Sequence, residues 1–480
     1  MRKQRAKDGV GSRSTAGQIA FPDEQASNAA GETQANGPQA SSAPEEPRSK
    51  TERKGKWYSL YDKVYAPSTL IAAWKRVKEN AGAAGIDRTT VKRFDENAEA
   101  RLEHLATDLR TKTYRPQPVR RVFIPKSGGG RRPLGIPTVR DRIVQQALLQ
   151  VMEPIFESTF SNRSHGFRPQ RGCATALHVV DRAVRSGYTW VVDADIRAFF
   201  DTVDQQKLLM AVNEKVSDGS VLKLIGQILK AGVVHPSVTE VEPTELGTPQ
   251  GGPLSPLLAN IYLHRLDERL VAAGWGLVRY ADDFVIFAKS EGEAQQALTL
   301  AREVLEGELG LAMHPEKTRV VSVASGFEFL GFHYFCDPKT GQRVKEVRQK
   351  SVLRFREQVR SRTPRLITQR RVKAKRVTCP RLRKNERIRQ MLASVNRLLR
   401  GWHVFFRHVW SRYPETPFRN FDGFVRQRVR MAITGRVGPG WWNVRLNNTV
   451  LSALGLLSLD DLQQRWHRRQ GHLKAPARQG

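Results

Sequence analysis

Two apolar segments of this chain are interrupted by acidic residues, and this feature limits its possible folds most strongly. The first reads Trp190-Val191-Val192-Asp193-Ala194-Asp195-Ile196, and in the second Asp282-Asp283 divides the apolar residues of 277–288. Both segments are typical of buried strands, in which residues two apart share a face. Carboxylates close together in a weakly hydrated site repel one another, so they need a compensating charge. For Asp282-Asp283 alone, an ordinary turn is the competing interpretation.

The surrounding pattern predicts an α+β fold. Strands at 189–196, 277–288 (a hairpin) and 319–323, with helices at 221–229 and 293–309, follow the order strand, helix, strand, strand, helix, strand. This is the order of a split βαβ unit, an antiparallel sheet backed by helices. The first strand then lies beside the hairpin, so Asp195 and Asp282 can converge. Two Mg²⁺ ions about 3.5–4 Å apart on such carboxylates would catalyse nucleotidyl transfer.

Segments before this unit predict further elements. Residues 119–126 and 133–137 surround Gly128-Gly129-Gly130 and indicate a basic β-hairpin, and residues 98–111 and 141–160 indicate helices. After Phe335 the chain is expected to become helical and basic, with an apolar stripe made of Ile388, Leu392, Val395, Leu399 and Trp402.

The positive charge is concentrated in the last third of the chain. The 480 residues have a formal net charge of +33, and residues 343–480 hold 34 of the 80 Lys and Arg but 7 of the 47 Asp and Glu. A short charge run is usually a solvated surface. A bias over more than a hundred residues favours a nucleic-acid partner, with a membrane surface as the second possibility.

Other classes are disfavoured. The three cysteines, Cys173, Cys336 and Cys379, form no CxxC pair, which argues against a zinc ribbon or a disulfide framework and fits a reducing interior. No run of about 18 apolar residues indicates a membrane span, and no secretory signal is recognised.

Seven sequence blocks, in order over residues 57–335, resemble reverse transcriptases encoded by group II introns. The most characteristic are Tyr280-Ala281-Asp282-Asp283, Asp195-Ile196-Arg197-Ala198-Phe199-Phe200-Asp201 and Gly247-Thr248-Pro249-Gln250-Gly251-Gly252-Pro253-Leu254-Ser255-Pro256. The others are Ile124-Pro125-Lys126 through Arg132-Pro133-Leu134-Gly135-Ile136-Pro137 to Asp141-Arg142-Ile143-Val144-Gln145, then Gly166-Phe167-Arg168-Pro169, Glu316-Lys317-Thr318-Arg319 and Phe327-Glu328-Phe329-Leu330-Gly331-Phe332. In addition, Val395-Asn396-Arg397-Leu398-Leu399-Arg400-Gly401-Trp402 resembles the maturase segment of the same proteins.

The resemblance implies a right-hand polymerase fold with fingers and a split βαβ palm, followed by a basic α-helical thumb or maturase domain. The regions expected are a disordered tail (1–55), an N-terminal extension and fingers (56–188), the palm with the catalytic aspartates (189–335), the thumb or maturase domain (336–432), and a short basic segment that could bind DNA (433–480).

The implied function is RNA-directed DNA polymerisation, copying intron RNA into DNA, together with help in splicing. The expected partners are intron RNA as template, primer or target DNA, and dNTPs, with no membrane, in a bacterial cytoplasmic ribonucleoprotein. The expected cofactor is Mg²⁺, as two ions. Asp195, Asp282 and Asp283 would be catalytic, and the metal site would comprise Asp195, Ile196, Asp282 and Asp283.

Four residues are expected to bind the nucleotide. Lys126 and Arg132 would clamp the triphosphate, the Gln250 amide would hydrogen-bond the nucleotide, and the Phe200 ring would exclude a 2′-hydroxyl. The competing interpretations are a solvated hairpin for Lys126 and Arg132 and turn structure for Gln250. For Phe200 the competing interpretation is an aromatic residue of the core, which suits the neighbouring Phe199 better.

Nucleic-acid contacts are expected from basic residues spread over the chain, namely Arg168, Lys317, Arg397, Arg400, Arg426, Arg428 and Arg430. Trp441-Trp442 and Trp466 could stack bases, although core packing is commoner. Residues 379–480 contain Cys379, His403, His408, His467 and His472, without the paired cysteines of the nuclease that many relatives carry. Second-strand priming would then come from a nick or a replication fork.

Two alternatives stay open from sequence. One is a reverse transcriptase of the same lineage that acts in defence or in CRISPR-linked spacer acquisition. The other is a non-catalytic RNA-binding splicing factor, which is disfavoured because such a protein has no physical need for three acids in apolar strands.

Overall fold

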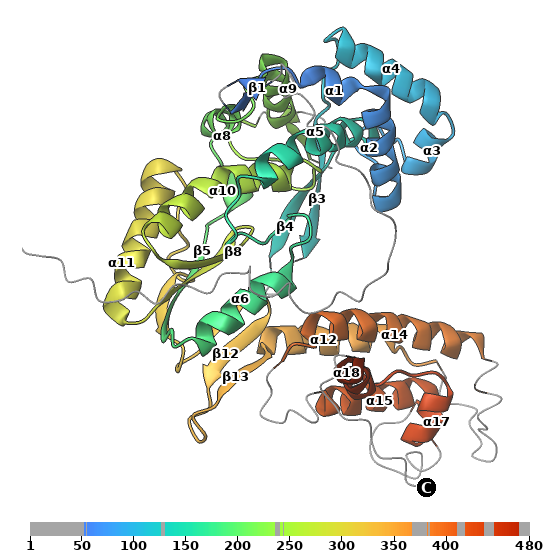
Figure 1. The fold of residues 1–480 in the computed structure, drawn as a ribbon. Coiled ribbons are helices and arrows are strands. Elements are labelled where there is room, and N and C mark those ends of the chain that lie inside the picture. Colours follow the sequence, from blue (N-terminus) through green and yellow to red (C-terminus); the bar gives the residue numbers. More distant parts are fainter. Residues whose placement is uncertain are drawn as a thin grey trace, which may run out of the picture.

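The computed structural model describes residues 52–53, 55–125, 130–235, 241–242, 244–366, 382, 385–409, 418–435 and 446–469 (Figure 1). Nearly all of the expected tail, 1–55, lies outside these ranges. Its described part contains β1 (Glu52–Arg53), which pairs with β2 (Lys56–Trp57).

Helices dominate the N-terminal region. They are α1 (Tyr61–Tyr65), α2 (Pro67–Asn80), α3 (Val91–Asp95), α4 (Ala98–Arg110) and α5 (Val139–Glu157). The helices expected at 98–111 and 141–160 are thereby confirmed. Helix α5 begins two residues earlier than expected because the Thr138 hydroxyl caps it, accepting a hydrogen bond from the Asp141 amide at 3.1 Å.

The basic hairpin expected around the glycine run is present. Strand β3 (Val119–Pro125) pairs antiparallel with β4 (Arg131–Ile136), and two short strands, β6 (Val233–Val234) and β7 (Val241–Glu242), extend this sheet. The residues at the hairpin tip, 126–129, lie outside the described residues.

The central sheet has the strand order β10-β5-β9-β8, with every neighbouring pair antiparallel. Its strands are β5 (Trp190–Asp195), β8 (Gly276–Tyr280), β9 (Asp283–Ala288) and β10 (Arg319–Ser322). Strands β5 and β8 are therefore parallel with β9 between them, which is the split βαβ order expected from the sequence.

Helices cover both faces of this sheet. One face packs against α10 (Ser255–Ala272) and α11 (Glu291–Arg302), and the other against α6 (Cys173–Arg185); Figure 1 shows α11 and α6 on opposite sides. The helix expected at 293–309 continues beyond α11 as the π-helix η2 (Glu303–Glu308). The other helices of this region are α7 (Phe199–Thr202), α8 (Gln205–Asn213) and α9 (Gly219–Leu229).

Burial alternates along β5 and decides where its acids point. Val192 and Ala194 belong to the core shared with α10 and α11, whereas Val191 belongs to the core on the α6 side. Since side chains two residues apart share a face, Asp193 and Asp195 project to the α6 side.

The chain does not become helical directly after Phe335, as the sequence suggested. A second sheet of three strands follows, made of β11 (Phe327–Phe329), β12 (Phe332–Cys336) and β13 (Arg343–Val347). The expected boundary between residues 335 and 336 falls inside β12. Aromatic packing holds this sheet to the central one, since Phe327 stacks on Tyr334 at 4.9 Å and meets Phe287 of β9 at 6.0 Å.

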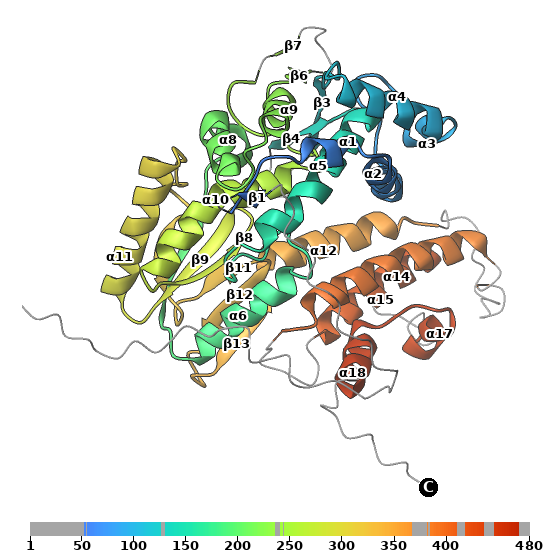
Figure 2. The same ribbon diagram turned by 45° about the horizontal axis from the view of Figure 1, so that its top comes forward.

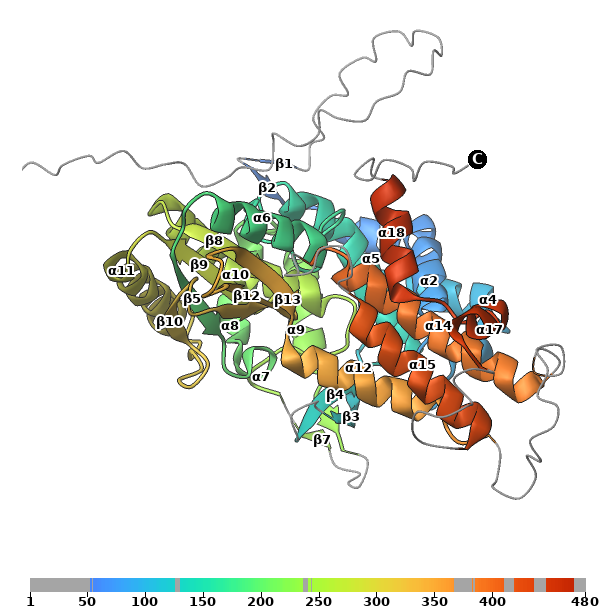
Figure 3. The same ribbon diagram turned by 90° about the horizontal axis from the view of Figure 1, so that it is seen from below.

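The remaining helices are α12 (Gln349–Arg362), α14 (Glu386–Phe406), α15 (Arg419–Thr434), α17 (Asn448–Ala453) and α18 (Leu459–Arg469). Figure 2 and Figure 3 show α12, α14 and α15 packed side by side. The predicted apolar stripe of α14 is confirmed, because Ile388, Leu392, Val395, Leu399 and Trp402 are all buried. Within the described ranges, no helix is both long and apolar enough to cross a lipid bilayer.

Candidate active site

The acidic residues of the two interrupted segments lie together at one end of the central sheet. Asp195, the last residue of β5, stands directly opposite Asp283, the first residue of β9. Asp282 occupies the turn between β8 and β9, and Asp193 lies on the same face of β5 as Asp195. The sequence predicted that Asp195 and Asp282 converge, and this register places them at the same end of the sheet, with Asp282 next to Asp283.

Burial and mutual repulsion make this cluster costly to charge. Burial raises the pKa of Asp283 to about 7, and the neighbouring Asp193, Asp195 and Asp282 add to the effect. The pKa of Asp282 is also raised, first by burial and then by Asp195, while Arg132 opposes the shift. Four carboxylates in one half-buried site create a demand for positive charge.

Two basic side chains from the β10 region supply part of that charge. The Lys317 ammonium group contacts the Asp195 carboxylate, and the Arg319 guanidinium lies 3.2 Å from an oxygen of Asp193. Lys317, expected to bind nucleic acid, is therefore engaged with a catalytic candidate, although its side chain remains 60% exposed.

The donor set of the cluster fits Mg²⁺, which prefers carboxylate oxygens. Across the part of the chain that the structure describes, no three ligating side chains are grouped closely enough to hold an ion as they stand. Asp195 is turned toward Lys317 instead. The side chain of Ile196 is a hydrocarbon buried in the core, and since it has no donor atom, only the main-chain carbonyl of this residue is a possible ligand.

The turn that carries Asp282 has an unusual backbone. Ala281 adopts φ 59°, a left-handed conformation that a side chain disfavours. Gly166 lies against this turn: a Cβ added there would be 2.4 Å from the Ala281 nitrogen. The glycine of the Gly166-Phe167-Arg168-Pro169 block is therefore required by the close approach of two backbones.

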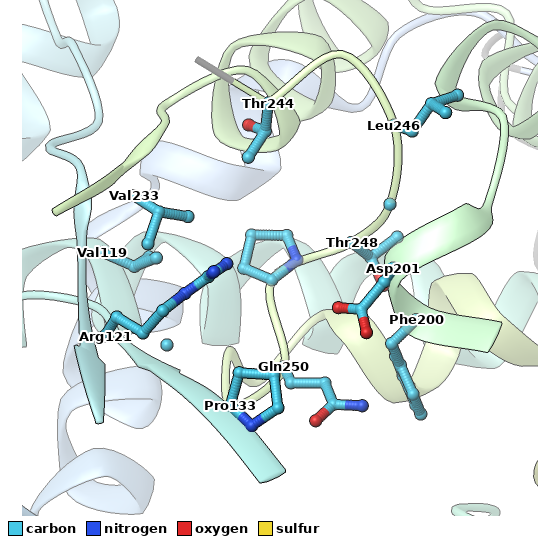
Figure 4. A pocket seen from close by; sticks show the side chains of 13 residues that line it. Val119, Arg121, Pro133, Phe200, Asp201, Val233, Thr244, Leu246, Thr248 and Gln250 are labelled. Carbon is cyan, nitrogen blue, oxygen red and sulfur yellow. The ribbon is translucent and has the colours of Figure 1, made fainter. Parts of the chain in front are cut away.

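A cavity of about 260 Å³ lies between the β3–β4 hairpin, the loop of residues 244–250 and the start of α7 at Phe200 and Asp201 (Figure 4). Figure 4 shows Arg121 extending into it from one side, and Phe200 and Gln250 on the other, with the Gln250 amide directed toward Phe200. Arg132 donates a hydrogen bond to the Gln250 amide oxygen at 3.2 Å.

The structure thus gathers Arg132, Phe200 and Gln250, three of the four residues expected to bind the nucleotide. Phe200 is half-buried, whereas Phe199 beside it is 2% exposed and belongs to the core. Lys126, the fourth, lies outside the described residues.

Arg168 does not fit the nucleic-acid contact expected of it. Its side chain is 3% exposed and its guanidinium is used internally, by Glu157 at 2.8 Å and by the carbonyls of Ser161 and Ser164. A buried guanidinium needs such partners, so Arg168 stabilises the segment before α6.

The arginines of the C-terminal helices fall into two groups. Arg397 and Arg400 are exposed on α14. On α15, Arg428 donates to the carbonyl of Thr363, and Arg430 donates to the carbonyl of Leu446 at 2.7 Å. Arg428 and Arg430 therefore connect α15 to other segments of the chain in addition to providing positive charge. Arg426, also on α15, is half-buried.

Of the aromatic residues considered for base stacking, Trp466 is half-buried and packs against Arg407, whose guanidinium lies 5.4 Å from its ring. Trp441 and Trp442 lie outside the described residues.

Three buried polar residues that were not predicted from the sequence lie beside the turn that carries Asp282: Asn260, Asp267 and Arg279. Arg279 is the fourth of the five residues of β8 and is fully buried. A signal was present in the sequence, because an arginine within an apolar strand requires a buried partner.

His165, just before Gly166, predicts a pH dependence of stability. Burial and the surrounding arginines lower its pKa to about 3. The pKa of His165 in the folded protein is below the ordinary value of 6.5, so the neutral imidazole is favoured by folding. The stability that His165 contributes is therefore complete above pH 6.5 and is lost as the pH falls toward 3. We expect His165→Gln to remove about 1.4 kcal/mol per pH unit from the slope of unfolding free energy between pH 6 and 4. Urea unfolding at several pH values measures the difference, and equal slopes in both proteins would contradict it.

Comparisons with known proteins agree with this geometry. Residues 124–334 match the family model described as "Reverse transcriptase (RNA-dependent DNA polymerase)". Protein YkfC of Escherichia coli K12 is 36% identical over an alignment of 308 residues, and the match covers 56% of this chain and 80% of that protein. The group II intron-encoded protein LtrA of Lactococcus lactis is 42% identical over 212 residues, covering 44% of this chain and 34% of its own length. The chain thus spans about a third of LtrA.

Among solved structures, a chain of a complex titled "Partial Cas6-RT-Cas1--Cas2 complex" is 28% identical and covers 52% of this chain and 42% of its own. Its TM-score is 0.34, which is too low to support an inference about function.

Proposed function

This chain belongs to the reverse transcriptases encoded by group II introns, which are RNA-directed DNA polymerases, and from that premise we propose that it extends DNA by two-metal nucleotidyl transfer. The observation that carries the proposal is the register that sets Asp195 opposite Asp283, with Asp282 in the adjoining turn. Two Mg²⁺ ions held by Asp195, Asp282, Asp283 and the carbonyl of Ile196 would activate the primer 3′-hydroxyl and stabilise the leaving pyrophosphate.

In this proposal the regions take the parts of a right-hand polymerase. The central sheet is the palm, and the β3–β4 hairpin with α5 belongs to the fingers. The second sheet leads from the palm to α12, α14, α15, α17 and α18, which belong to the thumb and maturase domain. The cavity beside Phe200 and Gln250 adjoins the hairpin and α7, the helix that follows β5 in the chain, and a nucleotide would enter there.

The protein's own residues position the reactants. Arg132 donates a hydrogen bond to Gln250, and its charge lowers the pKa of Asp282. It is therefore placed to bind the triphosphate of an incoming nucleotide. Its planar guanidinium suits two contacts to phosphate oxygens. Phe200 forms the wall against which the sugar would lie, and Lys317 balances Asp195 until a cation takes over that role.

The splicing part of the proposal depends on the C-terminal helices. Exposed Arg397 and Arg400, on a helix whose other face is buried, form a basic surface suited to the phosphates of a folded RNA. A related enzyme acting in defence or in spacer acquisition would keep the same active site. An intron RNA flanking the gene would exclude that alternative, and splicing of this RNA promoted by the protein would support the proposal.

Iron-mediated backbone cleavage tests the metal assignment without requiring polymerase activity. Fe²⁺ bound in place of Mg²⁺, with ascorbate and peroxide, should cut the chain near residues 195 and 282. Excess Mg²⁺ should suppress both cuts, and so should Asp282→Asn. Cleavage elsewhere, or at the same places in the variant, would show that these carboxylates do not hold the metals.

A further inference from the structure

A buried ion pair connects helix α10 to the strand that leads into the catalytic turn. Arg279 of β8 donates to both oxygens of Asp267 on α10, at 2.7 and 2.5 Å. Both side chains are completely shielded from solvent. The paired geometry uses one edge of the guanidinium and leaves further N–H groups to be satisfied.

Those remaining donors reach the turn itself. Arg279 Nη1 donates to the carbonyl of Ala281 at 2.9 Å, and to the side-chain oxygen of Asn260 at 3.1 Å. Ala281 is the left-handed residue that precedes Asp282. The guanidinium therefore holds the carbonyl of the very peptide that places the Asp282 carboxylate.

Asn260 extends the connection to the other side of the turn. Its amide nitrogen donates to the carbonyl of Gly166 at 2.8 Å, and Gly166 packs against the Ala281 backbone. Asn260 and Asp267 are seven residues apart, two turns of α10, so they lie on one face of that helix. Helix α10 therefore contacts the turn by two routes, through Arg279 and through Gly166.

The same helix begins next to the nucleotide-facing loop. Residues 247–254 lead directly into α10, and the Ser255 hydroxyl at its first turn donates to the carbonyl of Pro249 at 2.7 Å. The helix therefore connects Gln250 at one end with Asp282 through Asn260 and Asp267.

We propose that Asp267, Arg279 and Asn260 are positioning residues for nucleotidyl transfer, which fix the Ala281-Asp282 turn against α10. This inference rests on the proposed metal role of Asp282. Left-handed Ala281 is a conformation that the sequence disfavours locally, so it persists only where surrounding contacts determine it. A buried ion pair is weak evidence for stability, because an apolar pair of similar volume often replaces it without loss. The arrangement is better explained by the orientation it gives to the turn.

The test uses a double replacement, Asp267→Leu with Arg279→Met, which removes both charges and leaves no unpaired ion in the core. We expect a folded protein whose kcat for primer extension is at least about tenfold lower, because small displacements of reacting groups are costly. The KM for dNTP and the affinity for primer–template should change by less than about threefold, since neither is bound by these residues. The single variant Arg279→Lys keeps the positive charge but loses the planar set of N–H donors. Its kcat should lie between that of the double variant and that of the wild type.

A matched control is a second buried ion pair, formed by Asp181 of α6 and Lys345 of β13 in the second sheet, whose charged atoms are 2.7 Å apart. Asp181→Leu with Lys345→Met removes the same two charges and should keep kcat within about twofold. Wild-type kcat in the Asp267–Arg279 variant, or an equal loss in both double variants, would overturn the positioning role.

Iron-mediated cleavage separates this inference from the proposed function. If the inference holds, the Asp267–Arg279 variant cuts less near residue 282 than near residue 195, relative to the wild type. An unchanged ratio contradicts the positioning role while leaving the metal assignment intact. If instead the wild-type protein is not cut at either place, the metal assignment itself fails.

Discussion

Asp282→Asn is expected to reduce primer extension by a factor on the order of 10³ or more. The substitution keeps the size of the side chain but removes a negative charge from the cluster formed with Asp195 and Asp283. Loss of a metal-holding carboxylate withdraws several kcal/mol of transition-state stabilisation, and each 1.36 kcal/mol is a factor of ten in rate. Single-turnover extension of a labelled primer on an RNA template measures the loss.

Binding should survive in the same variant. RNA affinity, measured by filter binding, should stay within about twofold, because Asp282 carries no positive charge to contribute to phosphate contacts. Asp95→Asn is the control, since Asp95 pairs with Lys78 on the N-terminal helices, away from the sheet. An Asp282→Asn protein that extends primers at the rate of the control would refute the assignment of the cluster.

Phe200→Ala is expected to raise incorporation of rNTPs relative to dNTPs by about 10²-fold. The half-buried ring lines the cavity next to Gln250, where the sugar of an incoming nucleotide would lie. An apolar wall that rejects one added hydroxyl typically discriminates by about that factor. The ratio of kcat/KM for dCTP and rCTP, measured opposite template guanosine, gives the change.

Phe199→Leu is the matched control, because Phe199 is its chain neighbour, packs against Phe200 at 5.2 Å between ring centroids, and belongs to the core. It should lower stability by about 1 kcal/mol and leave sugar selectivity unchanged. Equal selectivity in the wild type and Phe200→Ala, or relaxed selectivity in Phe199→Leu, would contradict the role given to Phe200.

The central sheet could be predicted because its signals are local. Alternation along 190–196 and the apolar residues on both sides of Asp282-Asp283 specify strands, and the order of elements then brings Asp195 to the hairpin. The register that sets Asp195 against Asp283 follows from burying Val191 and Val192 on opposite faces.

Features that depend on long-range pairing were not predicted. The strand Arg343–Val347 contains three charged residues in five, and it is a strand because β12 pairs with it and Lys345 finds Asp181, 164 residues earlier in the chain. Composition instead suggested a helix. Arg168 and Lys317 were likewise expected to contact nucleic acid, although Arg168 is used internally and Lys317 faces Asp195. Charge alone does not reveal a buried partner.

Primer extension on an RNA template by the purified chain tests the central claim most directly. With Mg²⁺ and dNTPs, the wild-type protein should copy the template into DNA, and the product should disappear when EDTA removes the metal or when Asn replaces Asp282. Failure of the folded wild-type protein to extend any primer, or extension that persists in EDTA or in Asp282→Asn, would contradict it.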